Sequence, residues 1–337
     1  MHMADALLSP AVGGAFYAVS AGALCLAVRK TDKTDIEGSK LPLMAVSGAF
    51  VFAAQMINFA IPLTGSSGHI TGGILLASLL GAYPALLSMA AVLVVQCLLF
   101  ADGGLLALGA NTFNMAVIPC LVVYPLLFCP IVRGGLSHRR LTLAAVVSAV
   151  VSLEAGALCV TLQTLASGVT ELPFATFAGL MLSIHLAIGA IEGLATAALL
   201  NFVAKVRPEL LSAPIAAGGP SPAKRPSSGK LIAVVAALAV VTAGALSRAA
   251  SSNPDGLEWS VERTAGTSEL EGTSDVHAAS QAAQEKTALL PDYTLPSGRG
   301  TGTAGVIGAA ITCALALAAG GIISAVRQRR QHKTTRS

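Results

Sequence analysis

The chain of 337 residues is 54% hydrophobic and only 11% charged, with a mean hydropathy of +0.73. Because about a quarter of the residues in a soluble domain are charged, this composition excludes an ordinary soluble protein and predicts one embedded in a lipid bilayer. The net charge of +4 is not gathered into a basic patch interleaved with aromatic residues, so nucleic-acid binding is not expected.

Apolar runs predict nine membrane-spanning segments, each long enough, or nearly so, to cross the hydrocarbon core. The interval 69–100 is too long for one crossing, and the break at Gly81–Pro84 divides it into two short spans. The predicted spans are 11–29, 41–62, 69–81, 84–100, 109–132, 141–166, 174–204, 230–247 and 302–326.

The positions of the basic residues favour nine spans with the amino terminus outside. This topology places 17 of the 21 Lys and Arg residues on the cytoplasmic side. Treating 69–100 as a single span leaves 8 inside and 13 outside, against the cytoplasmic enrichment of basic residues in membrane proteins. The sequence therefore predicts an all-α integral membrane protein whose amino terminus and loops preceding residue 69 and following residue 100 face outward.

Composition divides the chain into three parts. Residues 1–206 are predicted to form a seven-span helical bundle, one pair of whose spans is short. Residues 207–229 are rich in Pro, Gly, Ala and Ser, which is typical of a flexible cytoplasmic linker. Residues 230–337 form a two-span unit with an outer loop, 249–300, predicted to be polar and partly disordered. Alternatively, the eight acidic residues of this loop attract cations.

The first two residues offer three nitrogen donors for a metal ion. The α-amine of Met1, the amide nitrogen of His2 and the imidazole of His2 can close one five-membered and one six-membered chelate ring. A second imidazole, such as His69, would complete a square-planar site suited to Ni(II), Cu(II) or Co(II). The alternative is that both histidines are ordinary polar residues of a terminus and of a Gly/Ser loop. Residues 1–10 lack the basic region of a signal peptide, so we expect these donors to be retained.

Other polar side chains within the predicted spans are functional candidates, because burying them in lipid is unfavourable. Four amides near the outer ends of spans either support a metal-bound imidazole or link helices: Gln55, Asn58, Asn111 and Asn114. His185 and Glu192 lie two helical turns apart on one face, where Glu154 could join them. A proton relay, a metal relay and a buried structural pair remain open, of which we favour the structural pair.

Catalytic motifs are not evident. The sequence lacks a phosphate-binding loop, an H-E-x-x-H motif and a G-x-S-x-G motif. The six cysteines form no C-x-x-C pair, so a thiolate metal site is not expected either. We therefore expect a transporter component without enzymatic activity, in which any ATP hydrolysis occurs on separate subunits.

Several sequence blocks resemble a known family. Those in the first 206 residues are similar to CbiM/NikM, the metal-capture component of cobalt and nickel energy-coupling-factor transporters: Met1–Pro10, Gly65–Gly73, Val95–Leu105 with Leu108–Met115, and His185–Gly193. In the second unit, Asn253–Ser260 and Pro291–Tyr293 resemble the PDGLE domain. Ala6 departs from the family pattern, in which Gly is common at this position, and its Cβ atom restricts the backbone conformations open to residues 3–8.

The resemblance implies a metal held by the amine of Met1, the backbone nitrogen and imidazole of His2, and the imidazole of His69. It implies uptake of Co(II) for cobalamin synthesis, or of Ni(II), across a prokaryotic cytoplasmic membrane, with no resident cofactor. The implied partners are a transmembrane scaffold and two ATP-binding subunits. The rival hypothesis is a proton-coupled secondary carrier that uses His185, Glu192 and Glu154.

Overall fold

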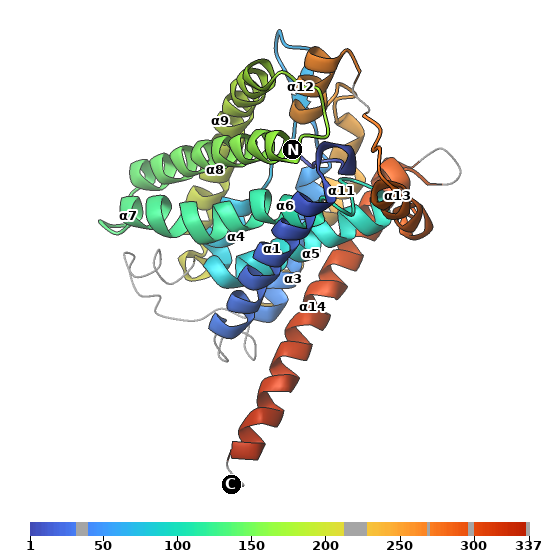
Figure 1. Cartoon of the computed structure of the whole chain (residues 1–337). Coiled ribbons are helices and arrows are strands. Elements are labelled where there is room, and N and C mark those ends of the chain that lie inside the picture. The colour runs from blue at the N-terminus through green and yellow to red at the C-terminus, as the bar shows by residue number, and fades with distance from the viewer. Residues whose placement is uncertain (32–39, 212–227, 268–269, 296–299, 335–337) are drawn as a thin grey trace.

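The computed structural model describes residues 1–31, 40–211, 228–267, 270–295 and 300–334, and they are mostly helical (Figure 1). Within this part of the chain, six helical segments are long and apolar enough to cross a membrane. They are α1 (Pro10–Lys30), α5 (Ala82–Phe100), the continuous run α6 (Leu108–Thr112), η2 (Phe113–Phe128) and α7 (Cys129–Val132), α8 (His138–Ser167), α9 (Phe174–Val206) and α14 (Thr301–Thr334). The predicted multi-pass helical membrane protein is confirmed, whereas the outward orientation of the amino terminus stays a prediction.

The three other predicted spans are shorter helices: α3 (Lys40–Gln55), α4 (Gly73–Leu80) and α11 (Ser228–Gly244). The prediction of a span over 69–81 is wrong, because eight helical residues extend only about 12 Å and the hydrocarbon core is about 30 Å thick. Gly81, with φ of 89°, separates α4 from α5. Residues 69–72 precede α4 as a loop, which leaves His69 outside any helix.

A small hairpin replaces the predicted end of the second span. Helix α3 ends at Gln55, and β1 (Phe59–Ile61) then pairs antiparallel with β2 (Ser66–Gly68). The apolar residues before Pro62 resemble a helix continuation, but a proline disfavours the helical conformation in the preceding residue. Positive φ angles at Leu63 and Gly65 then reverse the chain.

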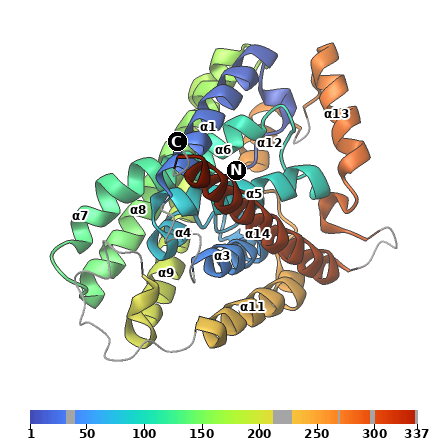
Figure 2. The same ribbon diagram turned by 90° about the horizontal axis from the view of Figure 1, so that it is seen from below.

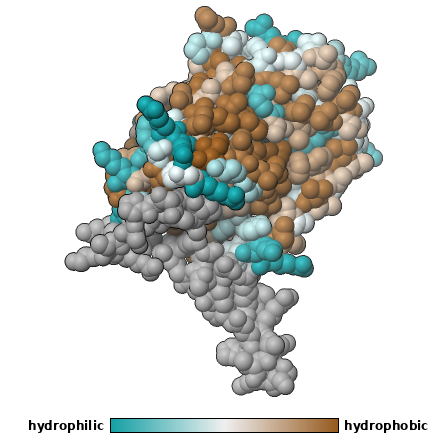
Figure 3. All heavy atoms as spheres, turned by 90° about the vertical axis from the view of Figure 1, so that its left-hand side faces the viewer, coloured by the Kyte–Doolittle hydropathy of each residue, from teal (hydrophilic) through white to brown (hydrophobic). Residues whose placement is uncertain are grey.

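The helices form two groups around a buried centre. Helices α8 and α9 pack along each other on one side, and α3, α11 and α14 lie together on the other (Figures 1 and 2). Between them, α4 and most of α5 are buried. Figure 3 shows a broad hydrophobic surface on the side of α8 and α9, where apolar side chains such as Leu158 and Leu194 are exposed. Such a surface suits contact with lipid.

The second unit differs from its prediction. Residues 212–227, most of the predicted linker, lie outside the described residues. The described part of the outer loop is largely ordered, with η4 (Leu246–Ala249), α12 (Gly256–Ala265), α13 (Asp275–Thr287) and η5 (Pro291–Tyr293). Both α12 and α13 begin with a capping box, which stabilises a polar helix at its start. Figure 1 shows α12 close to the amino terminus of the chain.

Candidate functional site

The chain begins inside the protein. Met1 and Met3 are buried, and η1 (Asp5–Leu7) and the N-cap Ser9 lead into α1. Asn111 holds this segment on both sides of Met3: its Oδ1 accepts from the Met3 amide at 2.8 Å, and its Nδ2 donates to the Met3 carbonyl at 3.1 Å. Ala6 does not have a positive φ angle, so an alanine at this position is compatible with the path of the backbone.

The α-amine of Met1 pairs with a residue of the second unit. Its nitrogen lies 2.7 Å from Oδ2 of Asp255. Burial alone raises the pKa of the Asp255 carboxyl, but the charge of the amine, the interaction with His69 and the hydrogen bond from the amine together lower this pKa below its ordinary value. The amine is therefore paired with an ionised carboxylate.

His2 is held at both ring nitrogens. Nε2 lies 3.1 Å from Oε1 of Gln96, whose amide nitrogen donates to Oε1 of Gln55 at 2.7 Å. Because Gln96 uses its nitrogen for Gln55, its oxygen is the acceptor and Nε2 of His2 is the donor. Nδ1 of a neutral His2 then carries a lone pair, and burial lowers the pKa of this imidazole. Gln55 completes the chain by donating to the Thr71 carbonyl at 2.7 Å.

A carboxylate faces the lone pair of His2. Oδ1 of Asp102 lies 3.2 Å from Nδ1, and Oδ2 of Asp102 accepts from the hydroxyl of Tyr293 at 2.5 Å. Burial, and then the negative charge of Asp102, raise the pKa of Tyr293, so the hydroxyl stays protonated. Nδ1 and Oδ1 are thus two acceptors that face each other unless His2 is protonated or a cation lies between them.

His69 lies against His2. The two rings are stacked, with centroids 5.4 Å apart and an interplanar angle of 22°. Nδ1 of His69 lies 3.3 Å from the Ile70 carbonyl; as donor to it, Nδ1 leaves Nε2 as the lone-pair nitrogen. Burial, followed by the positive charge of the amine, lowers the pKa of His69 to about 3. The structure therefore brings the predicted site residues Met1, His2 and His69 together at one buried place.

Glu192 fixes the loop that follows His69. Its carboxylate accepts from the Thr71 amide at 2.7 Å, the Gly72 amide at 3.0 Å and the Thr71 hydroxyl at 2.8 Å. Gly72 has φ of 80° and lies so close to Val51 that a Cβ atom would clash. Glu192 therefore has a structural role in shaping this loop.

His185 does not pair with Glu192. Its Nδ1 lies 2.8 Å from the Met181 carbonyl, and its ring lines a cavity of about 10 Å³ together with Met1, His69 and Asp255. That volume has room for about one water molecule. No hydrogen bond joins Glu154, His185 and Glu192 in the described chain, and Oε1 of Glu154 has no partner there. The three residues do not form a relay in this structure.

The two remaining predicted amides make different kinds of contact. Asn114 exchanges hydrogen bonds with Gln163 of α8, at 2.8 and 2.9 Å, and so links two helices. Asn58 makes its contact through the main chain, whose carbonyl accepts from the amide of Ser251 in the second unit. Sequence reasoning assigned no role to Gln96 or Asp102, and it named Asp255 only as one of eight acids in a loop that could attract cations. The pair Asp255 and Glu258 does carry the D-x-x-E signal of a helix start.

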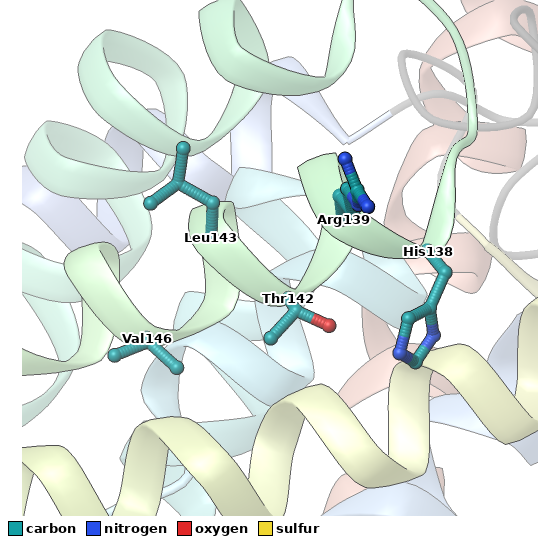
Figure 4. A pocket seen from close by; sticks show the side chains of 5 residues that line it. All are labelled: His138, Arg139, Thr142, Leu143 and Val146. Carbon is teal, nitrogen blue, oxygen red and sulfur yellow. The ribbon is translucent and has the colours of Figure 1, made fainter.

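A larger pocket lies elsewhere. It has a volume of about 440 Å³ on the first turns of α8, where Thr142 and His138 point toward the neighbouring helix (Figure 4). Met1 approaches α8 at Gly156, about 27 Å further along the helix. In the described chain, no three His, Cys, Asp or Glu side chains gather to hold a metal ion. A metal at the chain start would therefore rely on main-chain nitrogens as well as imidazoles.

Comparison with known proteins gives matches to two family models. Residues 2–210 match the family model for the cobalt uptake substrate-specific transmembrane region (CbiM), and residues 229–325 match that for the PDGLE domain. A putative fused nickel transport protein of Archaeoglobus fulgidus is 32% identical over 94% of this chain and 97% of its own length. A fused nickel transport protein of Rhodobacter capsulatus is 33% identical over 63% of this chain and 64% of its own length. A crystal structure of a transition metal transporter has a TM-score of 0.52 at 30% identity, over 61% of this chain and 93% of that one.

Proposed function

Because this chain belongs to the CbiM family of cobalt uptake transmembrane proteins and carries a PDGLE domain, we propose that it captures Ni(II) or Co(II) for an ATP-driven transporter of the energy-coupling-factor type. The ion is cargo, taken up at the start of the chain. The observation that carries this proposal is the burial of Met1 beside the stacked rings of His2 and His69.

Four nitrogens form the proposed ligand set. They are the amine of Met1, the amide nitrogen and Nδ1 of His2, and Nε2 of His69. The hydrogen bonds of Gln96 and Ile70 support this set, because each engages the ring nitrogen that is not used. Since the six-membered chelate ring closes through Nδ1 of His2, the incoming ion has to replace the contact between Nδ1 and Asp102. Placing a cation beside these two acceptors removes their mutual repulsion.

Nitrogen donors favour transition metals over magnesium and calcium, which prefer oxygen ligands. Two arguments, one from the proposed ligand set and one from a relative, favour Ni(II) over the Co(II) suggested by the sequence resemblance. A planar set of four nitrogens suits the ligand-field preference of Ni(II). The relative from Archaeoglobus fulgidus, which aligns with 94% of this chain and so shares both units, is named a putative fused nickel transport protein. Uptake of Co(II) for cobalamin synthesis is the alternative within the same class.

The proposed partners are a transmembrane scaffold and two ATP-binding subunits, which supply the ATP hydrolysis for which this sequence has no motif. The rival, a proton-coupled carrier, requires a relay through His185, Glu192 and Glu154. Nickel uptake into vesicles distinguishes the two. Uptake that requires ATP and the ATP-binding subunits supports our proposal, whereas uptake by this chain alone that collapses with a protonophore contradicts it.

Calorimetric titration of the purified full-length protein with Ni(II) tests the site. We expect binding to weaken at least 100-fold in His69→Ala and in a variant with one glycine added before Met1, because each removes or displaces a ligand. His138→Ala, which alters a histidine in the distant pocket on α8, is the matched control and should bind like the wild type. Unchanged affinity in the first two variants would contradict the ligand set. A parallel titration with Co(II) compares the two ions.

A further inference from the structure

We propose that Asp255, which belongs to the second unit, is a positioning residue that holds the amine of Met1 at the capture site. The proposal rests on the function proposed above, and it assigns to the PDGLE unit one specific task in metal capture. Oδ2 of Asp255 lies 2.7 Å from the amine nitrogen, although 254 positions separate the two residues in the chain. The contact therefore joins the two units at the metal ligands themselves.

Burial makes this contact important. The side chain of Met1 is only 3% exposed and that of Asp255 15%. A buried ammonium group without a partner is strongly unfavourable, because neither water nor a counter-charge replaces its hydration. Asp255 is the only carboxylate that the structure pairs with this amine within the described residues. Without the carboxylate, we expect the first residue to move out toward water and to carry a metal ligand with it.

The carboxylate is rigidly placed, so it can position the amine. Its other oxygen, Oδ1, caps α12 by accepting from the amides of Leu257 and Glu258 at 2.8 and 2.9 Å. The preceding carbonyl of Pro254 accepts from the amide of Ser67 at 2.8 Å, next to the loop that carries His69. The following residue, Gly256, fits closely against α9, where a Cβ atom would lie 3.0 Å from Ile188. The loop segment Pro254–Asp255 thus reaches both the amine and the neighbourhood of His69.

Holding the amine is compatible with binding a metal. A neutral amine has one lone pair for the metal and two N–H groups, of which one can remain on Oδ2 of Asp255. Carboxylates that accept a hydrogen bond from a metal-bound group orient that group and strengthen it as a ligand. A second arrangement is chemically possible, in which Asp255 competes with the metal for the amine, and it makes the opposite prediction.

Asp255→Asn tests the proposal in the full-length protein. Asparagine caps a helix as well as aspartate does, so α12 should keep its start. With its single oxygen on the helix amides, however, asparagine turns an NH2 group toward the amine in place of Oδ2, and this group cannot accept a hydrogen bond. We expect Ni(II) binding to weaken at least 10-fold and the ligand-field absorption of bound Ni(II) to shift to lower energy, because water replaces the amine in part of the population. Unchanged or tighter binding would overturn the proposal.

Trp259→Phe is the matched control on the same helix. It removes the 3.0 Å hydrogen bond from the indole to the Thr64 carbonyl, and so weakens docking of the second unit without altering the contact with the amine. We expect its Ni(II) affinity to stay within about 3-fold of the wild type. Equal weakening in both variants would show that docking alone matters, and would also overturn the proposal.

A measurement without metal keeps this test separate from that of the proposed function. A reagent selective for α-amines, followed by mass spectrometry of the first peptide, should label Asp255→Asn at least 10-fold faster than the wild type. Equal labelling rates would show that Asp255 does not hold the amine. If His69→Ala still binds Ni(II), the proposed function is contradicted. If His69→Ala no longer binds Ni(II), but Asp255→Asn has the amine labelling rate and the Ni(II) affinity of the wild type, only the role of Asp255 is contradicted.

Discussion

Replacing Glu192 with glutamine should weaken metal capture through the loop that follows His69. In the wild type, the carboxylate accepts from the amides of Thr71 and Gly72 and from the hydroxyl of Thr71. Glutamine keeps one oxygen and turns the other acceptor into a donor, which then faces a buried N–H or O–H group. The substitution therefore removes hydrogen bonds and leaves at least one donor unsatisfied.

The size of the effect follows from these contacts. A hydrogen bond to a charged group contributes about 1.5–3 kcal/mol, and a buried polar group without a partner costs about 1–3 kcal/mol. Because the loop can partly relax, we expect a net destabilisation of about 2–4 kcal/mol. Supporting hydrogen bonds around metal ligands typically change affinity about 10–100-fold, and we expect Ni(II) binding by Glu192→Gln to fall by a factor in that range.

Calorimetry with Ni(II) and thermal unfolding in detergent measure the two effects. Glu154→Gln is the control, because Oε1 of Glu154 is buried without a partner in the described chain, so removing its charge should leave affinity unchanged and stability equal or higher. The reasoning would be refuted if Glu192→Gln bound Ni(II) with wild-type affinity and stability. If that variant also lost transport, the result would support the proton-coupled carrier instead.

The remaining predictions concern acid stability, packing and metal-induced stabilisation. Burial lowers the pKa of His69 from 6.5 to about 3, so between pH 6.5 and pH 3 the unfolded chain binds a proton at this residue that the folded chain does not. The free energy of unfolding should therefore fall by about 2 kcal/mol as the pH drops from above 7 to 5. In a series of melting temperatures against pH, His69→Ala should show a smaller decrease over this range. Because the pKa of Asp255 is lowered in the folded chain, its contribution to the free energy of unfolding is present above about pH 4 and is lost only at lower pH. Below about pH 4, the melting temperature should therefore drop further in the wild type but not in Asp255→Asn. Gly68→Ala should destabilise the protein by about 1–3 kcal/mol, because the added Cβ atom would lie 2.5 Å from Ile188. Gly179→Ala is the control: the space around its Cα is open, so the melting temperature should stay the same or rise slightly. Ni(II) at 100 times its dissociation constant should stabilise the wild type by about 2.7 kcal/mol, and removal by a chelator should reverse the shift in melting temperature; an equal shift in His69→Ala would contradict binding at this site.

The sequence predicted the helices well because each long span carries its own signal. An apolar run of about 20 residues is recognisable without knowing its neighbours, and α1, α5, α8 and α9 begin and end within three residues of the predicted limits. The prediction failed where an apolar run does not form a helix. Phe59–Ile61 is as hydrophobic as the helix before it, and only the turn around Pro62 and Gly65 directs it into a hairpin.

The chemistry of the site was only half predictable. Met1 and His2 are adjacent in the chain, so the chelate rings follow from covalent geometry, and His69 stands out as a histidine in a glycine-rich loop. The groups that support them come from distant elements whose packing no local pattern encodes. Gln96 reads as one polar residue in an apolar helix, and Asp255 as one acid among eight in an outer loop. Their distances from His2 and Met1 exist only once the fold has formed.

The charges around the site separate attraction from selection. Asp102 and Asp255 place two carboxylates beside the proposed nitrogen donors, and carboxylates attract any divalent cation by charge alone. Each of these carboxylates uses one oxygen for a donor other than the amine or His2, Asp102 for the hydroxyl of Tyr293 and Asp255 for the start of α12, and one remaining oxygen from each falls short of the six or more oxygen ligands that magnesium and calcium prefer. An ion that needs oxygen ligands therefore gains little by staying, whereas an ion that binds the amine and imidazole nitrogens gains the chelate. The carboxylates thus concentrate all divalent cations near the site. Selection against magnesium and calcium comes from the amine and imidazole nitrogens, which are the donors that bind the ion.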